Sequence, residues 1–298
     1  LIRIADCLEK YKKDLIIAES KDNGKPESLA ERVDLPRAST NLRFFASAIL
    51  HESSEMHDMD GTAINYTLRQ PIGVAACISA WNLPLYLLTW KIAPAIAAGN
   101  TVVAKPSEIT PMTAYLFSKI CIEAGLPKGV LNIVHGLGSK VGDPLTTHPD
   151  VPVVSFTGGT VTGKHIASIT APMFKKLSLE LGGKNPNIIF DDADFEKAVS
   201  IAARAAFTNQ GQICLCGSRL FVQKGIYNKF KEALILKTKK LTVGDPKDSN
   251  SKLGAVVSKE HMQKILDKIA LAKSLGGNIL TGGEREILEG DLKSGYYI

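Results

Sequence analysis

Residues 151–169 read VPVVSFTGGTVTGKHIASI, and this stretch decides the fold class. Its first part, Val151–Phe156, is apolar on both faces, which predicts a strand buried inside a sheet. Its last part, Val161–Ile169, is long enough for a helix, and a pair of glycines makes the turn between the two. A strand, a tight turn and a helix form the repeating unit of an α/β protein with a parallel sheet.

The same alternation of short apolar runs and helical stretches continues in both directions along the chain. It predicts an α/β fold whose parallel sheet is covered by helices on both faces. Ligands of such sheets bind beyond the carboxyl ends of the strands, so the turns there are the candidate sites. The other predicted strands are Val74–Ile78, Thr101–Lys105, Val130–Val134, Leu177–Leu181, Asn187–Phe190 and Arg219–Val222, and the other predicted helices are Leu83–Ala98, Pro111–Ala124 and Phe195–Thr208.

Length and composition exclude several classes of protein. The chain has 298 residues, of which 45% are hydrophobic, so it can bury a core, is not disordered and is long enough for about two domains. Its most apolar stretch, Leu83–Ala98, contains two prolines and a lysine and is shorter than the ~20 residues of a membrane span. Aromatic residues make up only 6%, too few for a stacking nucleic-acid surface. The composition therefore predicts neither a membrane nor a nucleic-acid partner.

Five cysteines in a chain of this length are too few, and odd in number, for a disulfide framework. This favours a reducing compartment, and we predict a cytoplasmic location. Cys214 and Cys216 are close in sequence, but no second pair of Cys or His follows at zinc-binding spacing. No metal site is predicted.

The Gly182-Gly183 pair is the predicted pivot between two domains, because glycine allows backbone conformations that other residues resist. We predict one domain with N-terminal helices over 1–182 and a second over 183–298. The chain begins inside a helical pattern and ends in what reads as the start of a strand. We therefore expect a fragment whose second domain is incomplete at its C-terminus.

Residues 158–165 nearly match the phosphate-binding pattern G-x-x-x-x-G-K-[ST]. The apolar run 187–190 followed by two aspartates resembles the strand and acid that hold magnesium, so an NTP-hydrolysing enzyme is one hypothesis. Against it, His165 replaces the hydroxyl residue that would bind Mg²⁺, and a neutral imidazole is a poor ligand for that ion. Two interpretations stay open: backbone N–H groups that hold a phosphate without a metal, and a plain strand-to-helix turn.

Three other turns contain candidate residues. Residues 136–142 resemble a dinucleotide fingerprint with one residue too many, which alone favours a plain turn. Lys105 and Glu108 follow a predicted strand, where both can reach ribose hydroxyls; the alternative is a helix start capped by Ser107. Cys214 lies in a small, polar turn that is unusual for a structural cysteine, which favours a reactive thiol, whereas Cys216 is better explained as a packed residue.

Five motifs in order make the chain similar to a known family, the NAD(P)-dependent aldehyde dehydrogenases. Glu180 and Cys214 are 34 residues apart, as the pattern of that family requires, and the resemblance covers essentially the whole chain. It implies an aldehyde-dehydrogenase-like fold, with a Rossmann-type NAD-binding domain over 1–182 and an incomplete α/β catalytic domain over 183–298. The motifs are AWNLP at 80–84, AGNTVVAKPSE at 98–108, FTGG at 156–159, LELGGK at 179–184 and NQGQIC at 209–214.

The resemblance implies a role for three residues in catalysis. Cys214 is the nucleophile whose thiolate attacks the aldehyde carbon to give a thiohemiacetal. The side-chain amide of Asn82 and the backbone N–H of Cys214 stabilise the oxyanion. Hydride transfer leaves a thioester, and Glu180 deprotonates the water that hydrolyses it. Without the motif, Glu180 would be interpreted as a strand-end acid in an ion pair.

The resemblance also implies NAD as the cofactor, with Lys105 and Glu108 as ribose ligands. A carboxylate at Glu108 would repel the 2′-phosphate of NADP. The chain departs from the family at Ala80, where Pro is common, and at Gly159, where a Ser commonly contacts the pyrophosphate. The other residues implied at the cofactor are Ile78, Trp81, Ser107, Gly138, Phe156, Gly158, Gly159, Gly163 and Leu181.

Residues 34–46 and 82–91 look most like the branch of the family that acts on 2-aminomuconic and 2-hydroxymuconic semialdehydes. In that branch an arginine at the position of Arg37 holds the carboxylate of the substrate, a role that suits a planar two-pronged cation. The alternative for Arg37 is a solvated helix charge. The implied substrate is 2-aminomuconic semialdehyde, of tryptophan (kynurenine) catabolism, with retinal or a general aliphatic aldehyde as alternatives.

Other classes of function stay open at this point: a catalytically silent binding or structural relative, and the nucleotide hydrolase. The family's later segment at the nicotinamide ribose, and the strand it uses to dimerise, would lie beyond Ile298. We therefore expect the full-length protein to be a homo-oligomer and the chain alone to have little or no activity.

Overall fold

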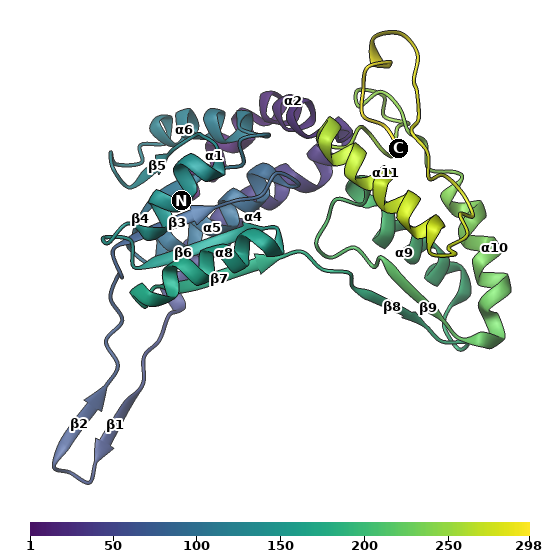
Figure 1. The fold of residues 1–298 in the computed structure, drawn as a ribbon. Helices are drawn as coiled ribbons and strands as arrows, with labels where there is room; N and C mark the ends of the chain where they lie inside the picture. Colours follow the sequence, from purple (N-terminus) through teal and green to yellow (C-terminus); the bar gives the residue numbers. More distant parts are fainter. The chain divides into compact units, whose positions relative to one another are not determined.

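The computed structural model describes residues 1–298, which divide into two units (Figure 1). One boundary falls beside the predicted pivot Gly182-Gly183. Residues 16–32 lie in the second unit, whereas the division by sequence places them in the first domain. The assignment of cofactor and catalytic roles to two domains stays a prediction. The first unit consists of Leu1–Leu15 and Val33–Glu180, and the second of Ile16–Arg32 and Leu181–Ile298.

A five-stranded sheet with the strand order β5-β4-β3-β6-β7 forms the centre of the first unit. Strand β3 runs parallel to both of its neighbours, and β4 runs parallel to β5. The predicted α/β fold is confirmed, and two strands of this sheet, β3 and β4, have the bounds expected from the sequence. The strands are β3 (Val74–Ile78), β4 (Thr101–Lys105), β5 (Leu131–Ile133), β6 (Val153–Gly158) and β7 (Lys176–Leu181).

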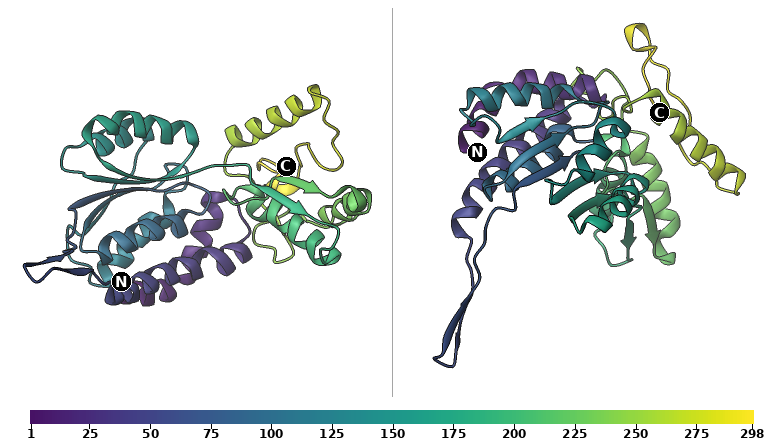
Figure 2. Two further views of the ribbon diagram at one scale, coloured as in Figure 1. Left: turned by 90° about the horizontal axis from the view of Figure 1, so that it is seen from below. Right: turned by 60° about the vertical axis from the view of Figure 1, so that its left-hand side comes forward.

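Helices cover both faces of this sheet (Figure 2). Helices α5 (Pro84–Ala97) and α6 (Met112–Glu123) pack on one face, and α8 (Thr160–Thr170) packs on the other. Helices α1 (Ile2–Lys10) and α4 (Leu35–Ala48) form an outer layer on α5 and α6. Because both faces are covered, four of the five residues of β3 are buried, which explains its apolar sequence.

The chain switches from one face of the sheet to the other between β3 and β6, which are neighbours at its centre. The register places Ile78 at the end of β3 opposite Lys105 of β4 and Phe156 of β6. Open α/β sheets bind ligands at the carboxyl ends of the strands beside such a switch point. The turns after β3, β4 and β6 therefore form the candidate site of the first unit.

A hairpin of β1 (Met56–Met59) and β2 (Ala63–Tyr66) projects from the first unit (Figure 1). It is not predicted from the sequence, because all eight strand residues are exposed and no buried face marks the strands. The turn does have a recognisable signal, Asp60-Gly61, and both residues have the positive φ angles that a type I′ turn requires.

The second unit is built around two parallel strands, β8 (Pro186–Ile189) and β9 (Arg219–Val222). Helices α9 (Phe195–Phe207) and α10 (Tyr227–Thr238) cover one face of this pair. The core between them contains Ile189, Val199, Ala202 and Phe230. The other face exposes large apolar side chains, Ile188, Phe190 and Phe221.

Residues 16–32 join the second unit through close backbone contacts. The amide of Glu27 donates to the carbonyl of Pro246 at 2.8 Å. Gly24 and Gly254 come so close that a Cβ on Gly254 would lie 1.9 Å from the Gly24 carbonyl oxygen. Beside this contact Lys25 and Glu19 form an ion pair, Nζ to Oε1 3.7 Å, in which both side chains are fully buried.

The other helical segments range from short turns to α11, which has 16 residues, and residues 244–250 form a polar loop. No helix is both long and apolar enough to cross a membrane. No group of three His, Cys, Asp or Glu side chains could hold a metal ion, and all five cysteines are free. The remaining helical segments are α2 (Lys12–Asn23), α3 (Glu27–Leu29), η1 (Ala30–Asp34), η2 (Ile49–His51), η3 (Gly138–Gly142), α7 (Asp143–Thr147), η4 (Ala171–Met173), η5 (Thr208–Gly211), η6 (Lys224–Ile226), α11 (Lys259–Ser274) and η7 (Gly290–Leu292).

Candidate active site

Lys105, Glu108 and Gly138 come together at the carboxyl ends of β4 and β5. The buried ammonium of Lys105 donates to Glu108 Oε2 at 3.0 Å, and Gly138 N–H donates to Glu108 Oε1 at 3.4 Å. Partial burial acts to raise the pKa of the Glu108 carboxyl, but backbone hydrogen bonds and Lys105 outweigh it and lower that pKa below its usual value. The group is thus a fixed, ionised carboxylate that remains 40% exposed, as a ligand for hydroxyl groups must be.

The helix-cap alternative for Ser107 and Glu108 is wrong. Helix α6 begins only at Met112, with Pro111 as its N-cap residue. Ser107 is buried, and its hydroxyl accepts from Ile109 N–H at 3.4 Å inside the turn. Glu108 is therefore held by a lysine and a glycine amide rather than by a helix dipole.

Two glycines lie where β6 ends and the next turn begins. A side chain would have room at Gly159 but not at Gly158. A Cβ on Gly158 would lie 2.4 Å from the Phe156 ring, so only glycine fits there without displacing that ring. A Cβ on Gly159 would meet nothing within 4 Å. Gly159 is the N-cap residue of α8, and Gly163 is buried one turn further along that helix. The exposed helix start at Gly159 is suited to an anionic group.

The bend after β3 contains a residue that the sequence analysis misses, Ser79. Its side chain is 3% exposed, and its hydroxyl has no hydrogen-bond partner in the protein. Ile78 beside it is buried, and Trp81 and Asn82 are half-buried just before α5 begins. Buried hydroxyl groups normally have a hydrogen-bond partner, so Ser79 at the switch point is a candidate contact for a ligand.

Glu180 is exposed at the end of β7, on the edge of the sheet. Its charge acts on Lys91 of α5, another residue with an unusual environment that the sequence analysis misses. Burial lowers the pKa of the Lys91 ammonium to about 8, although Cys77 and Glu180 act to raise it. Lys91 Nζ donates to Ser155 Oγ of β6 at 3.1 Å.

Cys214 is exposed on a turn of the second unit, and Cys216 two residues later is buried. The turn Ile213–Cys216 is closed by a hydrogen bond of 3.1 Å from Cys216 N–H to Ile213 O. Burial raises the pKa of the Cys216 thiol, whose Sγ lies 3.5 Å from Gly211 O. Of the two thiols, Cys214 is the accessible one, and Cys216 has the packed position expected of it.

The predicted catalytic residues are divided between the two units. Asn82 and Glu180 lie in the first unit, and Cys214 lies in the second, together with the predicted cofactor residue Leu181. The convergence of these side chains stays a prediction. Within the first unit, the predicted cofactor residues do gather at one edge of the sheet.

Arg37 of α4 is exposed, and its guanidinium lies over the ring of Tyr86, 5.5 Å from the centroid. Tyr86 follows Asn82 by four residues, at the start of α5. Next to it, Asn41 Nδ2 donates to Tyr86 O at 3.2 Å, which joins α4 to α5. Arg37 is thus an exposed charge of α4 that lies against a ring, and its role toward a substrate stays a prediction.

His165, the residue that departs from the phosphate-loop pattern, pairs with Asp143. Its Nε2 lies 3.0 and 3.1 Å from the two carboxylate oxygens. The pair links α8 to α7, the helix that follows the Gly138–Gly142 segment. No magnesium-binding role is needed to account for this residue.

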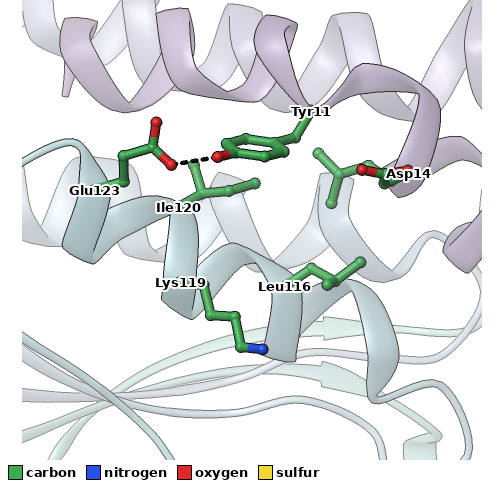
Figure 3. A pocket seen from close by; sticks show the side chains of 7 residues that line it. Tyr11, Asp14, Leu116, Lys119, Ile120 and Glu123 are labelled. Atoms are coloured by element: carbon green, nitrogen blue, oxygen red, sulfur yellow. Dashed lines mark hydrogen bonds between the residues drawn. The ribbon is translucent and has the colours of Figure 1, made fainter.

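A hollow of about 190 Å³ lies elsewhere in the first unit, between α6 and the chain where α1 ends and α2 begins (Figure 3). In Figure 3 the Tyr11 hydroxyl and Glu123 face each other across it, joined by a hydrogen bond. It contains none of the predicted site residues. Its lining is Tyr11, Asp14, Leu15, Leu116, Lys119, Ile120 and Glu123.

Comparisons with known proteins match the whole chain. The model of the aldehyde dehydrogenase family matches residues 1–298. The 2-aminomuconic semialdehyde dehydrogenase of Mus musculus is 52% identical over 283 residues, which are 95% of this chain and 58% of that protein. The 2-hydroxymuconic semialdehyde dehydrogenase of Pseudomonas sp. (strain CF600) is 41% identical over 303 residues, 100% of this chain and 62% of that one.

Solved structures agree with these matches. An aldehyde dehydrogenase from Bacillus cereus in complex with NAD+ superimposes with a TM-score of 0.96 at 37% identity. The match covers 100% of this chain and 60% of that structure. The chain therefore spans about three fifths of the length of the proteins that it resembles.

Proposed function

The chain belongs to the aldehyde dehydrogenase family, and on that premise we propose that the whole protein oxidises an aldehyde to a carboxylic acid with NAD. The observation that carries the proposal is the exposed Cys214, in an irregular turn of a chain that matches this family over its full length. A nucleotide hydrolase has no comparable support, since His165 is paired with Asp143.

The residues of the first unit fit NAD. Ser79 provides a buried hydroxyl without a partner at the switch point, and Glu108 provides an ionised carboxylate for the two ribose hydroxyls. The lack of a side chain at Gly158 keeps the Phe156 ring in place, and the start of α8 at Gly159 suits the pyrophosphate. When bound, NAD supplies the acceptor for the hydride.

The proposed mechanism uses a thiolate, an amide and a carboxylate. The Cys214 thiolate forms a bond to the aldehyde carbon, and the carbonyl oxygen becomes an oxyanion. The Asn82 amide and the Cys214 N–H donate to that oxyanion. After oxidation, Glu180 takes a proton from the water that attacks the Cys214 thioester, and the carboxylic acid leaves as the thiolate is restored. The exposure of Cys214 and Glu180 supports these roles.

We propose a semialdehyde that bears a carboxylate, such as 2-aminomuconic semialdehyde of tryptophan catabolism, as the substrate. The identities of 52% and 41% to dehydrogenases named for such semialdehydes support this choice. Arg37 is the proposed partner of the carboxylate, since its guanidinium lies beside the start of α5. A neutral aldehyde such as retinal offers Arg37 no partner. The homo-oligomer and the cytoplasmic location stay predictions.

The test uses the full-length protein and measures NADH formation. Cys214→Ser is expected to abolish turnover with every aldehyde, while NAD binding, measured by calorimetry, stays unchanged. Arg37→Ala is expected to lower kcat/KM about 10–100-fold for the carboxylate-bearing semialdehyde and to leave a neutral aldehyde unaffected. Arg37→Lys retains the charge and loses the planar fork. Its kcat/KM for the carboxylate-bearing semialdehyde should lie between the values of Arg37→Ala and the wild type. If Arg37→Ala changes both substrates in the same ratio, Arg37 does not bind the carboxylate.

A further inference from the structure

The segment around Cys214 has little regular structure of its own. Residues 212–218 belong to no helix or strand. Two residues before this segment, Asn209 and Gln210, have φ angles of 55° and 56°, which side-chain-bearing residues rarely adopt. A turn of this kind retains one conformation only when the surrounding structure determines it.

Asn185, just before β8, holds the part of this turn that contains the two cysteines. Its Nδ2 lies 2.6 Å from the carbonyl oxygen of Cys214 and 3.1 Å from that of Cys216. Because both neighbours are acceptors, only the NH₂ end of the amide can face them, and both of its hydrogens are used. A single side chain thus fixes the carbonyl groups of Cys214 and Cys216.

The backbone beside Asn185 holds the other end of the same segment. Asn185 O accepts from Arg219 N–H at 3.2 Å, and Lys184 O accepts from Arg219 Nε at 2.8 Å. Residues 184 and 185 therefore contact the segment at 214 and 216, and β9 at its first residue, Arg219. All of these contacts lie within the second unit.

We infer that Asn185 is a positioning residue for Cys214, which it orients by fixing the peptide plane that follows the thiol. The inference rests on the proposed role of Cys214 as nucleophile. The orientation of the Cys214 carbonyl sets ψ at that residue, and with it the relation between the thiol and the peptide unit after it. A displacement of about 1 Å at a nucleophile can cost a factor of about 10² in rate.

Two substitutions and one matched control test this inference in the full-length protein. Asn185→Ala removes both hydrogen bonds, and Asn185→Asp places a carboxylate oxygen against two carbonyl oxygens, so its effect should be larger. Gln223→Ala is the control, because that side chain also makes two hydrogen bonds, to Asp191 at the opposite end of β8 and β9. The expected losses in kcat are about 10-fold for Ala and about 100-fold for Asp, with KM and NAD affinity within about twofold of wild type.

Hydrogen exchange at residues 212–218 gives a readout that does not depend on turnover. The Cys216 and Gly217 amides should exchange at least about fivefold faster in both Asn185 variants and at the wild-type rate in Gln223→Ala. Unchanged exchange, or faster exchange with unchanged kcat, overturns the positioning role. A wild-type protein that oxidises no aldehyde overturns the proposed function instead, and the exchange data then still decide whether Asn185 fixes the turn.

Discussion

The sheets of the two units are stabilised in different ways. The five-stranded sheet of the first unit has helices on both faces, and four of the five residues of β3 are buried. The two-stranded sheet of the second unit has helices on one face only, and no more than one residue of either strand is fully buried. The candidate cofactor residues thus lie on a scaffold held by packing, at the edge of a continuous core.

The Cys214 segment depends instead on hydrogen bonds from side chains to the backbone. Asn185, Gln210 and Gln212 contact backbone groups at 214, 216, 255 and 257. Such bonds contribute about 1 kcal/mol each to stability, less than a buried apolar side chain does. They do, however, fix the orientation of the backbone groups that they contact. The comparison indicates that the first unit derives stability from burial, whereas the nucleophile segment derives its geometry from polar contacts.

Matched core truncations should have the largest effect. Phe117 of α6 and Phe230 of α10 are both 0% exposed. Phe117→Ala and Phe230→Ala should each lower the free energy of unfolding by about 3–5 kcal/mol. The loss at Phe230 includes its edge contact with Phe195, whose ring centroid lies 5.8 Å away. Urea denaturation measures the total, and hydrogen exchange shows where each variant loosens.

Exchange should rise in α6 and α1 for Phe117→Ala, and in α9, α10 and β8 for Phe230→Ala. Phe174→Ala is the control, since that side chain is 94% exposed and its loss should change stability by less than about 0.5 kcal/mol. A cost below about 1 kcal/mol for Phe230→Ala would mean that the second unit has no core of its own.

The buried amine of Lys91 gives the next largest effect, as a dependence on pH. Its pKa is about 8 in the folded protein against a usual 10.5, so between these values the unfolded chain binds more protons. Stability therefore rises with pH through this window, and the cost of the buried charge is present in full below it. Relative to Lys91→Met, the wild type should gain about 2–3 kcal/mol between about pH 7 and pH 10.

Urea denaturation of both proteins at several pH values measures this difference. Lys164→Met removes one exposed positive charge from the same unit and serves as the matched control. Parallel stability curves for wild type and Lys91→Met would show that the packed sheet does not depress the pKa of the amine.

Local pattern is sufficient to predict the strands of the five-stranded sheet in the first unit. Val74–Ile78 and Thr101–Lys105 are buried on both faces, so their apolar runs coincide with the strand bounds. The β1–β2 hairpin has no such run, and only its Asp60-Gly61 turn marks it. Residues 16–32 belong to the second unit, where Gly24 lies in close contact with Gly254. No local sequence pattern predicts a contact between residues so far apart in the chain.

The contacts of the candidate site are likewise of two kinds, those that the sequence predicts and those that only the folded chain shows. Lys105 is the last residue of β4 and Glu108 follows it by three residues, so their meeting can be predicted from the sequence. Lys91 meets Ser155 across 64 positions, and Asn185 meets Cys214 across 29, and neither pair matches a motif. Their roles follow from distances in the folded chain, which is why sequence patterns identify the thiol but not the amide that holds it.

A substitution on the exposed face of β8 and β9 should have the smallest effect on the free energy of unfolding of the 298-residue chain. Ile188 and Ile189 are neighbours in β8, but the first is 59% exposed and the second 8%. Ile188→Thr should change the free energy of unfolding by less than about 0.5 kcal/mol, because threonine keeps the β-branch and the site is already in water. Ile189→Thr, the matched control, buries a hydroxyl in the core and should cost about 1–3 kcal/mol. If urea denaturation gives equal costs for the two, both faces of this sheet are packed, and the contrast with the first unit does not hold.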